Sequence, residues 1–378
     1  MGELLVALDS FKGSLGAMQA TAALARGLRR HHSKPAVREH PVADGGEGTV
    51  SAAVAAGFTP VSLSAAGPLG EPLTARYAHR DGVAVVELAE TSGLAALPEA
   101  APTPATAAAA STHGTGQVIA AALDAGHHTV VVGLGGSATT DGGTGLLTGL
   151  GALLLDADGR ELPGRTSALG AIGSIDLSGL HPRLAGPDRA EVIVACDVDN
   201  PLLGLDGAAA VYGPQKGADG STVTALEEAM SRWAPILEQA TGVAAAAMPG
   251  AGAAGGAGFA LLALGARMVP GIDLVLRLTG LHARLPRAGL VLTGEGSLDL
   301  QSLRGKAPMG VASAARTAGV PTVAVAGRSV LTTSELTAAG FTGAFTLTEL
   351  EPDLERCVAD AERLLERLGE HIARHLLD

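Results

Sequence analysis

Apolar residues at the start of the chain fall into short runs separated by amphipathic stretches. The run Leu4–Leu8 predicts a strand, and the stretch from about Ala17 to Arg30 predicts a helix. A second strand over Pro35–Val42 and a second helix over about Thr49–Ala56 follow. Strands that alternate with helices of this length are typical of a parallel, doubly wound sheet.

The middle of the chain has a different pattern. From Pro60 to Leu88 the apolar runs are short, alternate with polar residues and are separated by turns, which predicts β-hairpins. A Pro/Ala-rich loop is expected over Leu97–Ala110. The helices expected after it are 115–125, 144–155 and 223–241, and the strands are 128–132 and 190–195.

The alternation of strands and helices returns after Ala288. The expected strands are 290–293, 322–326 and 345–347, and the expected helices are 306–318, 334–339 and 354–377. The sequence therefore predicts an α/β protein of two α/β domains, which its length of 378 residues also favours. Residues 1–64 and 286–378 are expected to form a discontinuous, Rossmann-like domain with a doubly wound parallel sheet. Residues 65–285 are expected to form an inserted, mixed α/β domain.

The composition narrows the functional classes. A net charge of −12 with only 2% aromatic residues argues against nucleic-acid binding, which needs basic surface and stacking platforms. Two cysteines cannot form a disulfide framework or a thiolate metal site. With no signal peptide before the first strand, we expect a cytoplasmic protein. The uncharged stretch Gln239–Ala266 is long enough to span a bilayer, but its glycines and alanines favour a buried loop and helix without a membrane partner.

The lysines are the most selective feature of the composition. Only four of the 26 basic residues are lysines, and three of the four adjoin a glycine, namely Lys12, Lys216 and Lys306. In a chain rich in Ala, Gly and Arg, a lysine is expected to persist where a compact ammonium group is required. Beside glycine-rich turns it indicates anionic oxygens held by backbone N–H groups and one point charge. Chance is the alternative, because glycine is abundant.

Polar side chains follow five of the predicted strands. The five turns contain Asp9, Ser10 and Lys12; Asp44 and Glu47; Ser137, Thr139, Thr140 and Asp141; Asp197, Asp199 and Asn200; and Glu295 and Asp299. Ligands of open parallel sheets bind at the carboxyl edge of the strands. A solvated turn would explain any one of these clusters, but five of the same design indicate a binding rim.

Two glycine-rich loops are candidates for binding phosphate. Residues 133–143, with the sequence GLGGSATTDGG, allow several N–H groups to face one anion, and the helix expected from Thr144 adds its positive end. A tight structural turn is the alternative. Gly250, Gly252 and Gly255 match G-x-G-x-x-G, but no strand precedes them, so this match is weak.

Carboxylates, lysines, hydroxyl groups and glycine-rich loops together suit phosphoryl transfer. That reaction needs oxygen ligands for magnesium, cations for the phosphoryl charge, and a carboxylate to orient the acceptor hydroxyl. The sequence contains no P-loop, nucleophile elbow or H-E-x-x-H motif that would indicate other chemistry.

Seven ordered blocks of the chain resemble the bacterial type I glycerate kinases. They are ALDSFKGSLGA (7–17), PVADGGEGT (41–49), GLGGSATTDGGTG (133–145), CDVDNPLLG (196–204), YGPQKGA (212–218), PGAGAAGGAG (249–258) and LTGEGSLDLQSLRGKAPMGVA (292–312). Gly16 and Thr140 depart from the family's usual Ser and frequent Asn, and neither change removes a charge. The resemblance implies two α/β domains and the phosphorylation of D-glycerate by ATP with Mg²⁺ to give 2-phosphoglycerate. Alternatives are 3-phosphoglycerate as the product, another small hydroxy acid as the substrate, or a non-catalytic sugar-acid sensor.

The lysines are assigned to the anionic groups of this reaction. Lys12 and Lys306 are predicted to contact the glycerate carboxylate or the transferring phosphoryl group. Lys216 is predicted to approach ATP from the other domain.

The carboxylates are divided between the acceptor hydroxyl and the metal. Asp44 ranks first as the base that positions the hydroxyl, ahead of Asp9 and Asp299, although it would alternatively cap the following helix. For magnesium we favour Asp197, with Asp44 or Glu295 nearby.

The ATP phosphates are predicted to lie against the first glycine-rich loop. The expected contacts are Gly135, Gly136, Ser137 and Thr139, largely through backbone N–H groups. The alternative cradle is the 249–258 loop, represented by Gly252.

Overall fold

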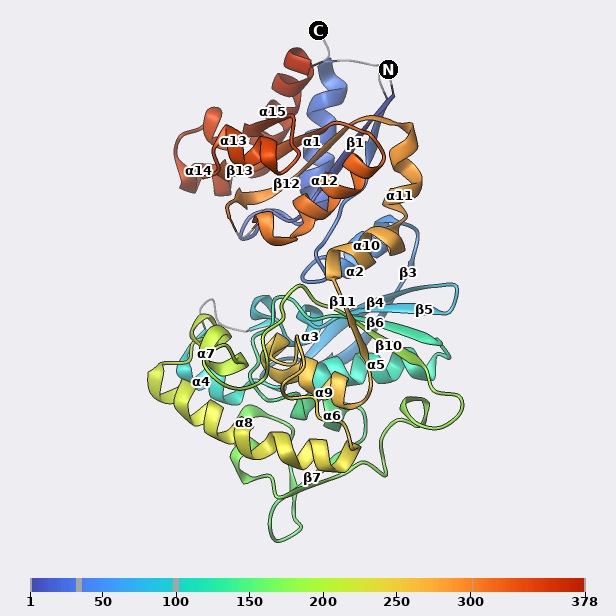
Figure 1. Cartoon of the computed structure of the whole chain (residues 1–378), viewed down its shortest axis with the longest axis vertical. Helices are drawn as coiled ribbons and strands as arrows, with labels where there is room; N and C mark the ends of the chain where they lie inside the picture. The colour runs from blue at the N-terminus through green and yellow to red at the C-terminus, as the bar shows by residue number, and fades with distance from the viewer. Residues whose placement is uncertain (1, 32–35, 98–101, 301, 377–378) are drawn as a thin grey trace. The chain divides into compact units, whose positions relative to one another are not determined.

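The computed structural model describes residues 2–31, 36–97, 102–300 and 302–376, which form two compact units. The first unit comprises Met1–Asp44, Ser51–Gly57 and Ile272–Asp378, and the second comprises Gly45–Val50 and Phe58–Gly271. The architecture confirms the predicted fold class, in which a mixed α/β region interrupts a discontinuous parallel-sheet region (Figure 1).

The first unit is built on a five-stranded parallel sheet with the strand order β14-β13-β12-β1-β2. The strands are β1 (Glu3–Leu8), β2 (Val37–Glu39), β12 (Ala288–Leu298), β13 (Thr322–Ser329) and β14 (Gly343–Thr346). The chain leaves β1 for β2 on one side and returns through β12 on the other. The strand order therefore reverses between β1 and β12, and such a switch point is where ligands bind in open α/β sheets.

Helices cover both faces of this sheet because successive side chains of β1 alternate between them. Leu4, Val6 and Leu8 pack with α1 (Ala17–His31) and α15 (Ala361–Leu376). The side chains between them pack with α10 (Gly271–Thr279), α11 (Leu281–Arg284) and α12 (Ala307–Thr317). The backbones of α1 and α15 touch at Gly27, where an added Cβ would lie 1.9 Å from the carbonyl oxygen of Glu366.

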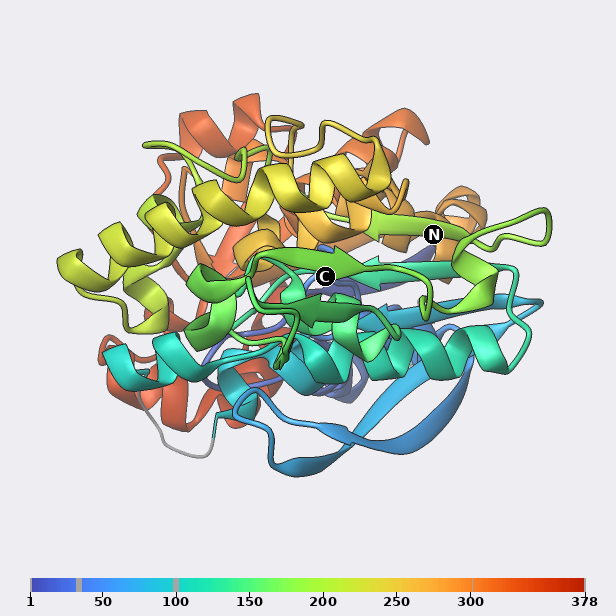
Figure 2. The same ribbon diagram turned by 90° about the horizontal axis from the view of Figure 1, so that it is seen from below.

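The second unit contains a six-stranded mixed sheet with the order β11-β10-β6-β5-β4-β3. Its strands are β3 (Thr59–Ala66), β4 (Pro72–Arg80), β5 (Val83–Glu87), β6 (Thr129–Gly133), β10 (Glu191–Ala195) and β11 (Arg267–Val269). The hairpin of β3 and β4, blue in Figure 2, forms one edge. From β5 onward the neighbours are parallel, so the carboxyl ends of β6 and β10 share one rim.

Helices and a small sheet complete the second unit. α5 (His113–Asp124) and α9 (Ala257–Ala263) pack on the six-stranded sheet, and α8 (Gly220–Thr241) carries the buried Trp233. A separate antiparallel sheet contains β7 (Leu153–Leu155), β8 (Glu161–Leu162) and β9 (Ser174–Asp176). Within the described residues, no helix combines the length and apolarity that a membrane-spanning segment requires.

Several predicted elements differ from the structure. The helix expected over 144–155 ends as α6 (Thr144–Gly149), because Gly151 adopts a φ of 99° and the apolar residues after it form β7. The terminal helix expected over 354–377 is broken at Asp360 into α14 (Leu354–Ala359) and α15. Pro35, residues 98–101, Gln301 and Leu377, which lie in predicted elements or motifs, are outside the described residues.

The compact units also divide at other points than the predicted domain boundaries. Strand β3 hydrogen-bonds to β4 and so belongs to the second unit, although residues up to 64 were expected in the first. Conversely, α10 and α11 pack on the parallel sheet of the first unit, although residues up to 285 were expected in the second. An apolar run indicates a strand or a helix without indicating which sheet it joins.

Candidate active site

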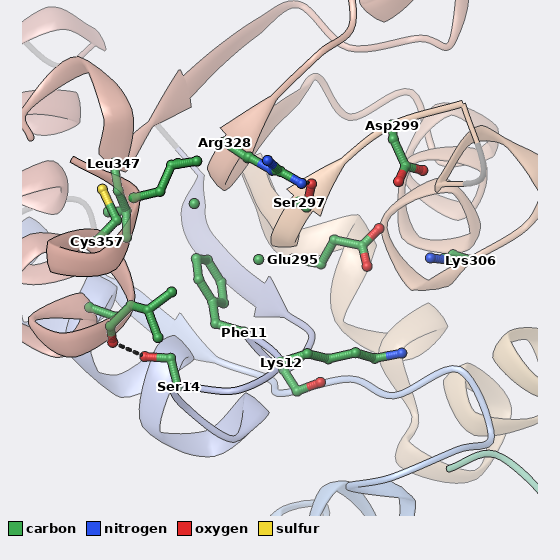
Figure 3. Close-up of a pocket in the computed structure, with 16 residues that line it drawn as sticks. Phe11, Lys12, Ser14, Glu295, Ser297, Asp299, Lys306, Arg328, Leu347 and Cys357 are labelled. Carbon is green, nitrogen blue, oxygen red and sulfur yellow. Dashed lines mark hydrogen bonds between the residues drawn. The ribbon is translucent and has the colours of Figure 1, made fainter. Parts of the chain in front are cut away.

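A pocket opens at the switch point of the first unit, where the loops after β1 and β12 meet (Figure 3). Its volume is about 410 Å³. Its polar lining brings together predicted residues from both loops, namely Lys12, Glu295, Asp299 and Lys306. Parallel strands present their carboxyl ends at one edge of the sheet, so side chains almost 300 positions apart in the sequence lie in the same pocket.

Two buried carboxylates lie at this rim. Asp9 is 5% exposed and accepts a hydrogen bond of 2.6 Å from the backbone N–H of Ser10. Burial, followed by the negative charge of Asp44, raises the pKa of Asp9 well above its usual range. Burial also raises the pKa of Glu295, while Ser302 and the two pocket lysines oppose that rise.

Glu295 carries an unusual oxygen for a buried carboxylate. Its Oε1 atom is buried and has no hydrogen-bond partner among the described residues. A buried oxygen of this kind is costly to leave unsatisfied, so it marks a place where a bound cation or proton donor would be stabilised.

Asp299 lines the pocket and also stabilises a turn. Its Oδ1 accepts a hydrogen bond of 3.0 Å from the N–H of Ser302, and the Ser302 hydroxyl lies 3.1 Å from the N–H of Asp299. These bonds close the turn that leads to Lys306, the N-cap residue of α12. Asp299 is half-buried, which suits a residue that shapes the rim.

The two pocket lysines differ in exposure. Lys12 is exposed and Lys306 is half-buried, and both line the cavity. In Figure 3 their ammonium groups lie on the same side of the pocket as the Glu295 carboxylate. This end of the pocket therefore combines fixed positive charge with a buried acceptor.

Glu87, which the sequence analysis missed, takes the capping role considered for Asp44. The N–H groups of Gly48 and Val50, at the start of α2 (Thr49–Ala55), each donate a 3.0 Å hydrogen bond to the Glu87 carboxylate. Burial raises the pKa of Glu87 to about 7, while these two hydrogen bonds oppose the rise. Glu87 could have been found from the sequence, because it ends the apolar run of β5 and so lies at the carboxyl edge of a strand, like the other polar residues considered.

The glycine-rich loop 133–143 lies in the second unit, and Asp141 holds it in place. The Asp141 carboxylate accepts hydrogen bonds of 2.8 to 3.1 Å from the N–H and hydroxyl groups of Thr112 and from the N–H groups of Gly143 and Gly145. These donors include the start of α6, so the positive end of that short helix already faces a carboxylate. The N–H groups of Gly143 and Gly145 at this helix end are therefore already bonded within the protein, and phosphate binding by the loop stays a prediction for its first part.

The first part of the same loop is more open. Gly136 is exposed and has a φ of 76°, and Gly135 packs so closely on Gly46 that an added Cβ would lie 2.4 Å from the Gly46 Cα. Among the described residues, the N–H groups of Gly135, Gly136 and Ser137 have no hydrogen-bond acceptor. Thr139, in contrast, is fully buried.

Lys216 is buried in the second unit. It is 2% exposed, and its Nζ donates a 2.6 Å hydrogen bond to the carbonyl oxygen of Thr139. Burial lowers the pKa of Lys216 to about 7, and the nearby charge of Asp141 opposes that change. Its contact ties the segment that follows α7 (Ala208–Tyr212) to the loop 133–143.

The second glycine-rich loop, 249–258, packs against the protein backbone. The N–H of Gly252 donates to the carbonyl oxygen of Asn200, and an added Cβ would lie 2.3 Å from the carbonyl oxygen of Pro201. Ala254 adopts a φ of 51°, which is costly for a residue with a Cβ. These glycines permit close packing, and the Gly252 N–H group that the alternative nucleotide cradle would use is already bonded within the protein.

Asp197 is exposed in the loop after β10, where its Oδ1 accepts a 2.7 Å hydrogen bond from the N–H of Gly271. In the parts of the chain that the structure describes, no group of three or more His, Cys, Asp or Glu side chains could hold a metal ion. A magnesium ion would therefore rely on one or two carboxylates and on oxygens of its ligands, which is usual for this metal.

Arg328 and Phe11 also line the pocket and were not singled out from the sequence. Arg328 follows the predicted strand 322–326, and its Nε donates a 3.1 Å hydrogen bond to the Ser297 hydroxyl. Arg328 could have been found from the sequence, because ligands of parallel sheets bind at the carboxyl ends of the strands. No pattern in the sequence indicated Phe11.

The chain is similar to known proteins along almost its whole length. The glycerate kinase family model matches residues 4–377. A glycerate kinase of Halalkalibacterium halodurans is 41% identical over 378 residues, covering 99% of this chain and 98% of the relative. The glycerate 2-kinase of Escherichia coli K12 is 40% identical over 329 residues, covering 86% of this chain and 85% of the relative. A crystal structure assigned as glycerate kinase 2 of Salmonella typhimurium LT2 is 38% identical, has a TM-score of 0.81 and covers 100% of this chain and 98% of its own.

Proposed function

Because the chain belongs to the glycerate kinase family, we propose that it transfers the γ-phosphoryl group of ATP to the 2-hydroxyl group of D-glycerate, giving 2-phosphoglycerate and ADP. The observation that carries this proposal is the switch-point pocket, where two lysines and two carboxylates line one cavity. The similarity to a glycerate 2-kinase favours the 2-phosphate over the 3-phosphate. Neither of the two cysteines is in a disulfide, which is usual for cytoplasmic proteins and supports that location.

Lys12 and Lys306 are assigned to the anionic groups of the reactants. The glycerate carboxylate and the transferring phosphoryl group both carry negative charge, and fixed cations stabilise such charge without reorganising during the reaction. Lys216 has a different assignment. Because its ammonium group is buried against Thr139, we propose that it positions the loop 133–143 and does not contact ATP directly.

Asp44 is assigned to orienting the acceptor hydroxyl and accepting its proton, with Asp9 and Asp299 as the neighbouring alternatives. Asp44 is half-buried and close enough to raise the pKa of Asp9 through its charge. Asp299 is the weaker alternative, because its Oδ1 closes the turn with Ser302.

Replacing Asp44 with asparagine is expected to lower kcat by at least about 100-fold, the usual contribution of a positioned general base. The melting temperature should change little, because Glu87 accepts the hydrogen bonds at the start of α2. Steady-state kinetics and thermal melting test both expectations. Glu47→Gln, an exposed change on the same turn, is the control, and near-normal kcat in Asp44→Asn would exclude Asp44 as the base.

Glu295 in the first unit and Asp197 in the second unit are each proposed as a candidate magnesium ligand, with Asp44 as a further candidate in the first unit. The buried, unpartnered Oε1 of Glu295 fits a cation ligand, and Asp197 has its carboxylate oriented by the N–H of Gly271. When bound with ATP, magnesium supplies charge neutralisation to the transferring phosphoryl group.

The ATP phosphates are assigned to Gly135, Gly136 and Ser137, with Thr139 supporting the loop from its buried position. The support is the set of backbone N–H groups without intramolecular acceptors on the open part of this loop. Several N–H groups on a glycine-rich turn form a suitable site for phosphate oxygens.

Gly136→Ala is expected to raise the KM for ATP at least about tenfold, because the new methyl group would hold phosphate away from the backbone. The stability cost should be only about 1 kcal/mol, since the added Cβ would meet Ala89 at an ordinary 3.4 Å. Gly159→Ala has the same left-handed backbone and nothing within 4 Å, so it controls for this cost. An unchanged KM for ATP in Gly136→Ala would remove the loop from the nucleotide site.

The activity itself is tested by incubating the protein with ATP, MgCl₂ and D-glycerate and identifying the product by phosphorus NMR. We expect 2-phosphoglycerate and an equal amount of ADP. 3-Phosphoglycerate would correct the acceptor hydroxyl, and turnover only with another hydroxy acid would correct the substrate. Tight binding of an acid without ADP release would favour a sensor.

A further inference from the structure

The pocket of the first unit has a polar end and an apolar end (Figure 3). The polar end holds the charged groups of Lys12, Lys306 and Glu295. The apolar end is lined by Phe11, Leu347, Leu354, Cys357, Val358 and Ala361. Both ends belong to one cavity of about 410 Å³.

D-Glycerate uses only part of this cavity. All three of its carbons carry oxygen, so the molecule offers no alkyl surface to the apolar end. The cavity volume lies in the range of pockets that enclose much larger, drug-sized ligands. A three-carbon acid held at the lysines therefore gains nothing from the apolar end of the pocket.

Hydrogen bonds hold the apolar end in place relative to the lysine loop. The Ser14 hydroxyl donates a 2.6 Å hydrogen bond to the carbonyl oxygen of Val358, drawn as a dashed line in Figure 3. The Cys357 thiol donates a 3.0 Å hydrogen bond to the carbonyl oxygen of Glu351. Because Ser14 lies two residues after Lys12, the first bond connects the apolar wall directly to the charged loop. The pocket is therefore preformed for a ligand that is anionic at one end and apolar at the other.

We infer that this pocket also accepts 2,3-dihydroxy acids that carry an alkyl chain on carbon 3, and that the protein phosphorylates them. The inference rests on the proposed function. The acid's 2-hydroxyl oxygen forms a bond to the γ-phosphorus of ATP, the bond from that phosphorus to the bridging oxygen breaks, and ADP leaves with the electron pair. The hydroxyl proton passes to the Asp44 carboxylate and then to water. The alkyl chain lies along Phe11 and Val358.

The expected gain follows from burial of the chain. Each buried methylene group improves kcat/KM by roughly fourfold until the apolar end is filled. The protein should therefore turn over 2,3-dihydroxybutanoate and 2,3-dihydroxypentanoate, with the D-glycerate configuration at carbon 2, at least as efficiently as D-glycerate.

The experiment compares kcat/KM for these three acids with ATP and MgCl₂. The inference is supported if the two longer acids equal or exceed D-glycerate. Normal turnover of D-glycerate with values more than tenfold lower for both longer acids would overturn this inference alone. An absence of turnover with D-glycerate would instead reject the proposed function.

A pocket variant tests where the alkyl chain lies. Val358 is 49% exposed, so Val358→Phe can be accommodated while it fills the apolar end. The ratio of kcat/KM for 2,3-dihydroxypentanoate to that for D-glycerate should fall at least tenfold. Val330→Phe, the same change at an exposed position outside the pocket lining, should leave the ratio unchanged. An unchanged ratio in Val358→Phe would show that the chain lies elsewhere.

Discussion

Lys306→Met is expected to lower kcat/KM for D-glycerate by about 100- to 1000-fold, the loss that follows removal of one preorganised electrostatic contact. The lysine lies at the N-cap of α12 and its side chain faces the pocket that also holds Lys12 and Glu295. Methionine keeps the length and most of the apolar volume of the side chain, so the fold should persist. Steady-state kinetics at saturating ATP measures the effect.

Two further variants make this result specific. Arg316→Met removes an exposed charge from the other end of α12 and should leave kcat/KM unchanged. Lys306→Arg should recover only part of the activity, because a planar guanidinium does not replace a compact ammonium group. A loss of less than about fivefold in Lys306→Met would remove this lysine from the phosphoryl-transfer mechanism.

Lys216→Met is expected to remove a pH dependence of stability from the second unit. Burial lowers the pKa of Lys216 to about 7, whereas the unfolded chain has an ordinary lysine with a pKa near 10.5. Between these values the unfolded state binds one more proton, so the free energy of unfolding rises with pH. The stability of the wild type minus that of Lys216→Met should increase by about 2 kcal/mol from pH 7 to pH 9.

Trp233 provides the measurement. It is the only tryptophan, is fully buried in the second unit, and donates a 3.0 Å hydrogen bond from Nε1 to the carbonyl oxygen of Gly142. Urea unfolding followed by its fluorescence therefore reports on the unit that contains Lys216. The pKa values of Asp9 and Glu87 are also raised, but both groups titrate in the wild type and in the variant. Their contributions to the free energy of unfolding therefore cancel in the difference.

The control for this experiment is Met230→Leu, a change in the same core cluster as Trp233 that alters no ionisable group, and its stability difference from the wild type should stay constant between pH 7 and pH 9. If the difference for Lys216→Met also stays within about 0.5 kcal/mol, the Lys216 ammonium group is solvated in the native protein and its positioning role is excluded.

The rim of the parallel sheet was predictable because it depends on local pattern and on one general property of parallel strands. Leu4–Leu8 and Leu290–Thr293 read as strands, so Lys12, Glu295 and Asp299 were expected at their carboxyl ends. All three line the switch-point pocket. The resemblance to glycerate kinases was also contained in the motifs, and the family match confirms it.

The sequence was less informative where a side chain contacts a part of the protein that is distant in the sequence. Lys216 and the 249–258 loop looked like parts of an anion site because lysines and glycines are common in such sites. In the fold, the Lys216 ammonium group reaches a carbonyl 77 positions away, and Gly252 allows close contact with the backbone at Pro201. Burial of this kind depends on which elements pack together, so it cannot be predicted from the spacing of neighbouring residues.

Local pattern was therefore enough to identify the α/β class, the family and several residues that line the switch-point pocket, because strand periodicity and turn chemistry act over a few residues. Packing between distant segments decided which charged groups remain at a surface. It buried Lys216 and Asp141, assigned the cap of α2 to Glu87, and brought the apolar wall at Val358 beside the loop of Lys12. These outcomes depend on solvent exclusion and on hydrogen bonds between segments far apart in the chain, which exist only once the chain has folded.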